Sequence, residues 1–304
     1  MIKKTIYVGN PYHINVCNSQ LVLATPNAKG IDKVFNQSIA LEDIGVIILD
    51  NQQISITQHV LQQIANYNIA CVVCNQNHMP ALLQLPLEAH TIQQERFENQ
   101  INASEPLKKQ LWQQTIKQKI TNQGKLIRKM GIETDAFEHL AKKVKSGDTG
   151  NEEAKASVIY WKLFFSKFFD GFVRDRFAPY PNNFLNYGYA VLRATVARSL
   201  SGSGLLPTLG IFHKNRYNAF CLADDIMEPY RPFVDELVYR IIAENKGETN
   251  LTKPIKQQLL TIPVLDVLIE GQQSPLMVAT QRTSASLAKC FAGEARKILY
   301  PDIT

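Results

Sequence analysis

Hydrophobic residues follow two different periods along this chain. Up to about residue 75 they form short runs, apolar or alternating with polar residues, at Thr5–Val8, Gln20–Ala24, Gly45–Leu49 and Ile69–Cys74. Runs of this length, separated by Asn, Pro and Gly turns, predict β-strands. One segment of this part, Thr57–Tyr67, instead carries its apolar residues on one side at helical spacing. It predicts a short amphipathic helix.

Beyond residues 80–86 nearly every long segment has a helical period. Helices are expected to start at Ser104 with Pro106 in the first turn and at Ser274-Pro275, because Ser and Pro favour these positions. Two further helices are expected to start at Asn186 and at Phe233. Three glycines are expected to separate helices: Gly124, Gly131 and Gly147. We therefore predict an α+β protein with a small N-terminal β-rich domain, residues 1–90, followed by a larger all-α domain, residues 91–304.

Composition adds the general class. The chain has 304 residues, of which 45% are hydrophobic and 20% charged, so it can bury a core and is not a disordered chain. No apolar run is long enough to span a bilayer, and the first fifteen residues lack the apolar core of a signal peptide. We expect a cytoplasmic protein. Cys71 and Cys74 form a CxxC inside an apolar run, and among five scattered cysteines this predicts core residues rather than a redox or zinc pair.

Positive charge is concentrated in one segment. The chain carries 33 basic and 27 acidic residues, a net charge of +6. Residues 105–145 contain ten basic and four acidic residues, a difference of +6 that equals the excess of the whole chain. Such a cluster is either a surface that attracts phosphates or a solvated helix face.

The stretch Leu209–Asp235 carries the candidate chemistry. If its middle is helical, Asp225 and Glu228 lie one turn apart on one face. With His213 they offer one imidazole and two carboxylates, a donor set that suits Mn²⁺ or Mg²⁺ better than structural zinc. The alternative is a structural histidine beside a solvated acidic pair, with prolines that end the helix. Three other histidines have no acidic residue nearby in the sequence and receive no role: His13, His59 and His78.

A second acidic position opens an earlier helix. The turn at residues 147–151 can cap a helix that starts near Glu152, in which Glu153, Ala156 and Tyr160 share one face. By spacing alone, Glu153 is best explained as an N-terminal acid that favours the helix dipole.

Three segments together resemble a known family: NEEAKASVIYW, LGIFHKNRYNAFCLADDIMEPYRPFVDELV and SPLMVATQRTSASLAKCFAGEARKILYP. They are similar to the CRISPR-associated spacer-acquisition integrase, or adaptation endonuclease, of the type II branch, and NYGYAVLRA fits the same family. The resemblance implies a metal site of Mg²⁺ or Mn²⁺ with Glu153, His213 and Glu228 as ligands and catalytic residues. Asp225 matches a nearby acidic position that supports the metal or orders water. The chain departs from the family at Ala154, where Gly is common, and at Ala156-Ser157, which bears on helix packing rather than on chemistry.

The resemblance also implies partners and a reaction. The family acts as a homodimer built through the β domain, with a small ferredoxin-like adaptation partner and other type II CRISPR proteins. It inserts a short double-stranded DNA fragment at a CRISPR repeat by transesterification, the helical domain being catalytic. Basic residues would neutralise phosphates, and three flank the implied ligands: Lys214, Arg216 and Arg231. Two alternatives stay open, a metal-dependent nuclease without integration and a DNA-binding architectural subunit with a vestigial site.

Overall fold

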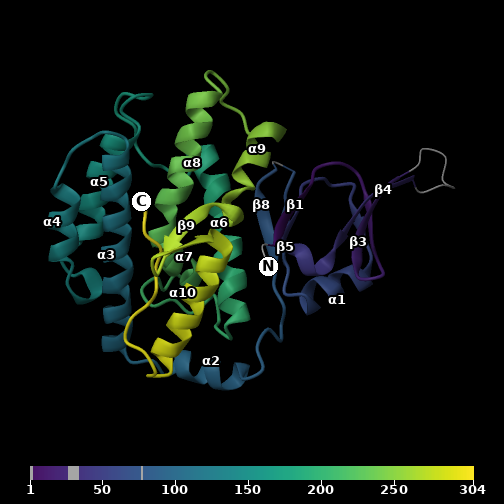
Figure 1. Ribbon diagram of the computed structural model, residues 1–304, viewed down its shortest axis with the longest axis horizontal. Coiled ribbons are helices and arrows are strands. Elements are labelled where there is room, and N and C mark those ends of the chain that lie inside the picture. Colours follow the sequence, from purple (N-terminus) through teal and green to yellow (C-terminus); the bar gives the residue numbers. More distant parts are fainter. Residues whose placement is uncertain (1–2, 27–33, 77) are drawn as a thin grey trace. The chain divides into compact units, whose positions relative to one another are not determined.

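The computed structural model describes residues 3–26, 34–76 and 78–304. The chain divides into two compact units, Met1–Ala89 and His90–Thr304 (Figure 1). The first is rich in strands and the second mostly helical, which confirms the predicted α+β class. Nowhere in these described ranges does a helix combine the length and apolar character needed to cross a membrane.

Two four-stranded sheets form the first unit. Their strands are β1 (Lys4–Val8), β2 (His13–Cys17), β3 (Gln20–Thr25), β4 (Val34–Ala40), β5 (Ile44–Leu49), β6 (Ser55–Ile56), β7 (Ala70–Cys74) and β8 (Pro80–Gln84). One sheet has the order β1-β5-β7-β8, in which the first three strands are parallel. The other has the order β4-β3-β2-β6.

The four predicted strands correspond to β1, β3, β5 and β7, and they contain the apolar runs. Every residue of β5 is buried, as expected for the central strand of a parallel sheet. The four strands that the pattern did not predict have weaker signals. For example, β6 has only two residues, and no residue of β8 is fully buried.

The predicted amphipathic helix is α1 (Gln58–Asn66). The hydroxyl of Thr57 accepts the N–H of Val60 at its start, and Val60 and Ile64 pack into the core of the unit. Cys71 and Cys74 are buried free thiols, which confirms that they are core residues.

The expectation that His78 has no acidic partner is wrong. Its Nδ1 lies 2.8 Å from Oδ1 of Asp50, a buried carboxylate that directly follows β5. The hydroxyl of Tyr7 donates to the other oxygen of Asp50 at 2.6 Å. Burial and this carboxylate raise the pKa of Tyr7. The parallel sheet brings these residues together, and their separation in the chain hides the contact from a local search.

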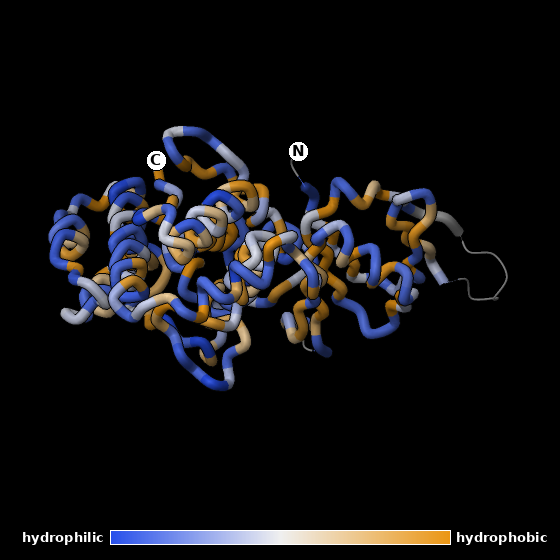
Figure 2. Tube along the Cα trace, turned by 90° about the horizontal axis from the view of Figure 1, so that it is seen from below, coloured by the Kyte–Doolittle hydropathy of each residue, from blue (hydrophilic) through white to orange (hydrophobic). Residues whose placement is uncertain are grey.

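The second unit is built from nine α-helices within the described residues. They are α2 (Gln93–Ile101), α3 (Glu105–Lys129), α4 (Ala136–Lys143), α5 (Glu152–Phe164), α6 (Asn182–Gly202), α7 (Cys221–Met227), α8 (Arg231–Glu244), α9 (Lys253–Leu259) and α10 (Leu276–Phe291). Helix α6 is the central one, because 16 of its 21 residues are buried and α7, α8 and α10 pack around it. Figure 2 shows hydrophobic and hydrophilic residues alternating along the helical part of the trace, as amphipathic helices require.

The start of α3 confirms the prediction at Ser104, whose hydroxyl accepts the N–H of Leu107, with Pro106 in the first turn. The expectation that Gly124 separates two helices is wrong, because this glycine lies inside α3. A Cβ there would lie 2.6 Å from Cβ of Phe137 in α4. The glycine therefore serves close packing of α4 on α3, at the cost of helix propensity.

Three further boundaries differ from the sequence prediction. Helix α6 begins at Asn182 rather than Asn186. Ser274-Pro275 does not cap α10 through a side chain but ends β10 (Gln272–Pro275), which pairs with β9 (Asp266–Ile269) in a hairpin. The hairpin turn, Glu270-Gly271, has positive φ at both residues, a turn that Gly favours. Helix α8 begins at Arg231 rather than Phe233, with Pro232 in its first turn. Helix α7 ends at Met227, and Pro229 lies in the 3₁₀ helix Glu228–Tyr230 that follows it.

Candidate functional site

Asp225 organises the loop that carries His213. Its carboxylate is fully buried on α7 and accepts the backbone N–H groups of Phe212 at 2.9 Å and of His213 at 3.2 Å. The same carboxylate lies 2.5 Å from Nδ1 of His213. These three contacts fix both the backbone and the imidazole of His213.

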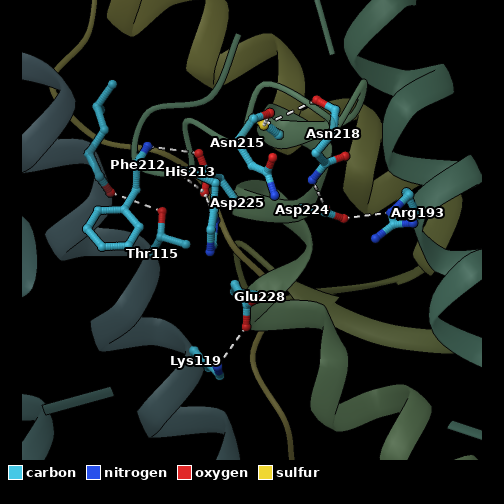
Figure 3. A network of polar contacts seen from close by, with 12 residues as sticks. Thr115, Lys119, Arg193, Phe212, His213, Asn215, Asn218, Asp224, Asp225 and Glu228 are labelled. Carbon is cyan, nitrogen blue, oxygen red and sulfur yellow. Dashed lines mark hydrogen bonds and ion pairs between the residues drawn. The ribbon is translucent and has the colours of Figure 1, made fainter. Parts of the chain in front are cut away.

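Asp224 fixes the other side of the same loop. It accepts from Nε of Arg193 in α6 at 2.6 Å and from the side-chain amide of Asn218 at 2.7 Å (Figure 3). The two adjacent aspartates of α7 therefore hold the loop between His213 and Asn218 at both ends.

Aromatic contacts add a third support, on α3. The ring of Phe212 stacks on Trp112 with centroids 4.2 Å apart, and the His213 ring meets Trp112 edge-on at 5.7 Å. Gly210 allows the tight approach of the loop to α7. A Cβ at this position would lie 2.4 Å from the His213 carbonyl oxygen and 2.8 Å from Oδ2 of Asp225.

Two glutamates from separate elements converge on Lys119 of α3. Its ammonium contacts Oε1 of Glu153, in the first turn of α5, and lies 2.7 Å from Oε2 of Glu228 at the start of the 3₁₀ helix. The Lys119 and Glu228 side chains are only 9% and 8% exposed, so the pair is almost fully desolvated. Glu153 is anchored locally, because Ser157 donates to it at 3.1 Å and Asp148 accepts the N–H groups of Glu152 and Glu153.

The charges of this cluster stabilise one another. Burial alone would lower the pKa of Lys119, but the negative charges of Glu228 and Glu153 outweigh it and raise the pKa. Burial would raise the pKa of Glu228, but Arg231 and Lys119 outweigh it and lower the pKa. Lys119 and Glu228 therefore both remain charged at neutral pH.

Arg231 is the second cation of Glu228. It lies 3.0 Å from Oε1 and stacks over the ring of Tyr189, with its guanidinium carbon 4.7 Å from the ring centre. The Tyr189 hydroxyl donates at 2.5 Å to Asp235, which also accepts the hydroxyl of Tyr160 at 2.8 Å. Since Tyr160 lies on α5 and Asp235 on α8, this network joins the helix of Glu153 to the element of Glu228.

The structure thus places the four predicted site residues in two neighbouring groups, Glu153 with Glu228 and His213 with Asp225. Figure 3 shows Glu228 between Lys119 and the His213–Asp225 pair. The donor types fit Mg²⁺ or Mn²⁺, because the carboxylates of Glu153 and Glu228 already share one cation, the Lys119 ammonium. In the part of the chain that the structure describes, however, no three His, Cys, Asp or Glu side chains lie close enough together to form a group able to hold a metal ion.

The His213–Asp225 pair is electrostatically coupled. Its hydrogen bond to Asp225 raises the pKa of His213, against the opposing effect of burial. Burial raises the pKa of Asp225, against the opposing hydrogen bonds of His213 and the loop backbone. When Nδ1 donates to Asp225, Nε2 is the nitrogen left to act as a ligand.

The three predicted phosphate contacts differ in surroundings. Lys214 and Arg216 are exposed and line a cavity of ≈ 430 Å³ beside His213, together with Lys108. Lys214 pairs with Glu105 at 3.0 Å, a weak exposed ion pair that a phosphate can replace. Arg231 instead lies inside the site as the partner of Glu228.

Sequence reasoning missed Lys119, Arg193 and Asp224. Lys119 was counted in the basic segment 105–145 as one surface charge among ten, but it is buried. A signal was present: Trp112, Ile116 and Leu126 lie at i−7, i−3 and i+7 from it, so Lys119 interrupts the apolar stripe of α3. Other basic residues of the segment are neutralised locally, such as Lys125 by Asp302 and Arg128 by Glu138.

Comparisons with known proteins agree on one family. Residues 7–261 match the family model described as CRISPR associated protein Cas1. The chain is 37% identical over 275 residues to the CRISPR-associated endonuclease Cas1 of Neisseria meningitidis serogroup C, covering 88% of each protein.

Solved structures share the fold. A casposase bound to its integration product superposes with a TM-score of 0.77 at 18% identity, over 98% of this chain and 92% of the casposase. A chain of a Cas6-RT-Cas1–Cas2 complex superposes with a TM-score of 0.74 at 16% identity, over 99% of this chain and 36% of the longer one.

Proposed function

This chain belongs to the Cas1 family of CRISPR-associated proteins, and on that premise we propose that it is a metal-dependent DNA integrase of spacer acquisition. The family, the endonuclease name of the Neisseria relative and the casposase fold all support nuclease and integrase chemistry. The strongest support is the geometry of the site itself. Glu153 and Glu228, from separate elements, share one cation beside a histidine that is itself held by a buried aspartate.

The metal would be held by Glu153, His213 and Glu228. When bound, Mg²⁺ or Mn²⁺ stabilises the negative charge that develops on a phosphate under attack and on the leaving oxygen. The protein's own groups position these ligands: Asp225 orients the imidazole of His213, Arg231 holds Glu228, and Ser157 holds Glu153.

The proposed reaction is a transesterification of DNA. The 3′-oxygen of a short fragment forms a bond to phosphorus in the CRISPR repeat, and the bond from that phosphorus to the repeat's own 3′-oxygen breaks. The proton of the attacking hydroxyl ends on the leaving hydroxyl, so no net charge is created. The reaction needs no separate energy source, because one phosphodiester bond replaces another.

We propose a homodimer that works with a small ferredoxin-like partner and further type II CRISPR proteins. The Cas1–Cas2 assembly among the structural relatives supports a partner of this kind. Lys108, Lys214 and Arg216 line the cavity beside His213 and would contact DNA phosphates. DNA binding should therefore weaken steeply with salt.

An assay of strand joining tests the proposal. The full chain, with and without its small partner, is incubated with a short duplex, a supercoiled plasmid bearing a repeat, and Mn²⁺ or Mg²⁺. We expect wild type and His139→Ala to join the duplex covalently to the plasmid and His213→Ala to join none. His139 is a fair control because it is an exposed histidine of the same unit, on α4.

Other outcomes of the assay separate the alternatives. Nicking of the plasmid without joining would identify a nuclease that uses water in place of the 3′-hydroxyl. Joining that survives His213→Ala would overturn the assignment of the site, and an architectural role with a vestigial site would account for it.

A further inference from the structure

The ammonium of Lys119 lies between Glu153 and Glu228, where two negative charges favour a cation. This ammonium contacts Glu153 and lies 2.7 Å from Glu228, so one cation is paired with two site carboxylates. A side chain that is 9% exposed cannot exchange these contacts for water without moving. The pairing is therefore a defined state of the site rather than a passing surface contact.

The charges around the two glutamates balance without a metal ion. Glu153 and Glu228 contribute two negative charges, and Lys119 and Arg231 contribute two positive ones. A divalent cation entering this neutral cluster would be opposed at short range by a cation already between its ligands. One of the two basic side chains has to withdraw before the dication is favoured.

Lys119 is the one that can leave. Arg231 stacks over Tyr189 and pairs with Glu228 within its own helical segment, so its guanidinium is fixed on two sides. Lys119 reaches the glutamates from α3 through a flexible four-carbon stem, and its ammonium is a point charge without a planar fork to align. Rotation about its stem would free both carboxylates together.

We propose that Lys119 is a built-in competitor of the metal ion, which holds Glu153 and Glu228 together in the metal-free protein and withdraws when the ion binds. The proposal deepens the proposed function and rests on the metal site that it assigns. It makes Lys119 a positioning residue that sets metal affinity.

The test measures Mn²⁺ binding to the full-length protein by calorimetry, with Mn²⁺ alone as the probe. Lys119→Met keeps the apolar stem and removes the charge. We expect it to bind Mn²⁺ roughly tenfold more tightly than wild type or better, since a broken buried ion pair typically changes an equilibrium by more than that. Lys125→Met is the matched control, because Lys125 lies on the same helix and pairs with Asp302 at 2.9 Å outside the site. It should bind Mn²⁺ as wild type does.

A second measurement follows melting temperature with and without Mn²⁺. The metal-free Lys119→Met protein should melt below wild type, because two carboxylates lose a shared cation, and saturating Mn²⁺ should remove the difference. A variant that folds only in the presence of Mn²⁺ supports the proposal equally. A variant that binds Mn²⁺ no more tightly than wild type overturns it, as does one whose melting temperature Mn²⁺ fails to restore.

The wild-type protein gives an independent check. A crystal structure with Mn²⁺ should show the Lys119 ammonium withdrawn from between Glu153 and Glu228, and Mn²⁺ bound with Lys119 still in contact with both would refute the proposal. Failure of the underlying function looks different. If neither wild type nor Lys119→Met binds Mn²⁺, the metal site itself is wrong; if wild type binds and the variant binds no better, only the role of Lys119 is wrong.

Discussion

Gly210→Ala is expected to impair joining by displacing His213 while the fold is kept. The added Cβ would lie 2.4 Å from the carbonyl oxygen of His213, whereas an ordinary van der Waals contact begins near 3.4 Å. The loop must therefore shift by about 1 Å. It cannot shift freely, because the same Cβ would lie 2.8 Å from Oδ2 of Asp225 and 3.1 Å from Cβ of Cys221.

The expected loss follows from the size of that shift. A displacement of about 1 Å of a catalytic group can reduce a rate roughly 100-fold. The rate of covalent joining of a short duplex to a plasmid measures it directly, beside circular dichroism and the melting temperature of each protein. We expect a loss of about two orders of magnitude with helical content unchanged.

Gly171→Ala is the matched control. Gly171 has φ of +68° and no atom within 4 Å of its Cβ position, so the substitution adds backbone strain of about 1 kcal/mol without a steric contact. It should lower the melting temperature slightly and leave joining intact. Joining by Gly210→Ala at the wild-type rate would refute the steric argument, and an equal loss in both variants would show that stability, rather than the position of His213, limits the rate.

Three further predictions concern stability, each read as a melting temperature. Burial, opposed by the hydroxyls of Tyr189 and Tyr160, raises the pKa of Asp235 from 3.8 to about 6. The folded protein therefore binds this proton more tightly than the unfolded chain, so a contribution of about 3 kcal/mol is present below pH 4 and lost as pH rises through 6. The melting temperature of wild type relative to Asp235→Asn should fall between pH 4 and 7, and a constant difference would contradict this. Asp148→Ala should lower the free energy of unfolding by about 1–2 kcal/mol, because it removes the acceptor of two N–H groups at the start of α5. Asp148→Asn keeps one acceptor and should lose less stability. Equal losses in the two variants would argue against capping. Gly124→Ala should destabilise the folded protein by about 1–3 kcal/mol although alanine has the better helix propensity, because the added Cβ would lie 2.6 Å from Cβ of Phe137. A more stable variant would show that α4 moves to make room for the added methyl group.

The hydrophobic pattern alone determined much of the fold. Short apolar runs identified β1, β3, β5 and β7, and helical periods identified the helices of the second unit, since both signals depend on which side of an element is buried. The start of α3 was also predictable from the sequence, because a Ser cap and a first-turn Pro act through neighbouring residues. The hairpin at residues 266–275 was not predictable, because its strands are short and its turn is set by Glu270-Gly271 rather than by an apolar pattern.

The candidate site, too, was only partly predictable from the sequence. Glu153, His213 and Glu228 were named from segments that resemble a family, and Asp225 from its place beside them. What the sequence could not provide was Lys119 between the two glutamates, or Arg193 and Asp224 bracing the His213 loop. The identity of a lysine in the sequence does not show whether its side chain is solvated or buried. Only the packing of α3 against α5 and the 3₁₀ helix decides that this one is desolvated, because burial depends on elements that are distant in the chain and adjacent in space.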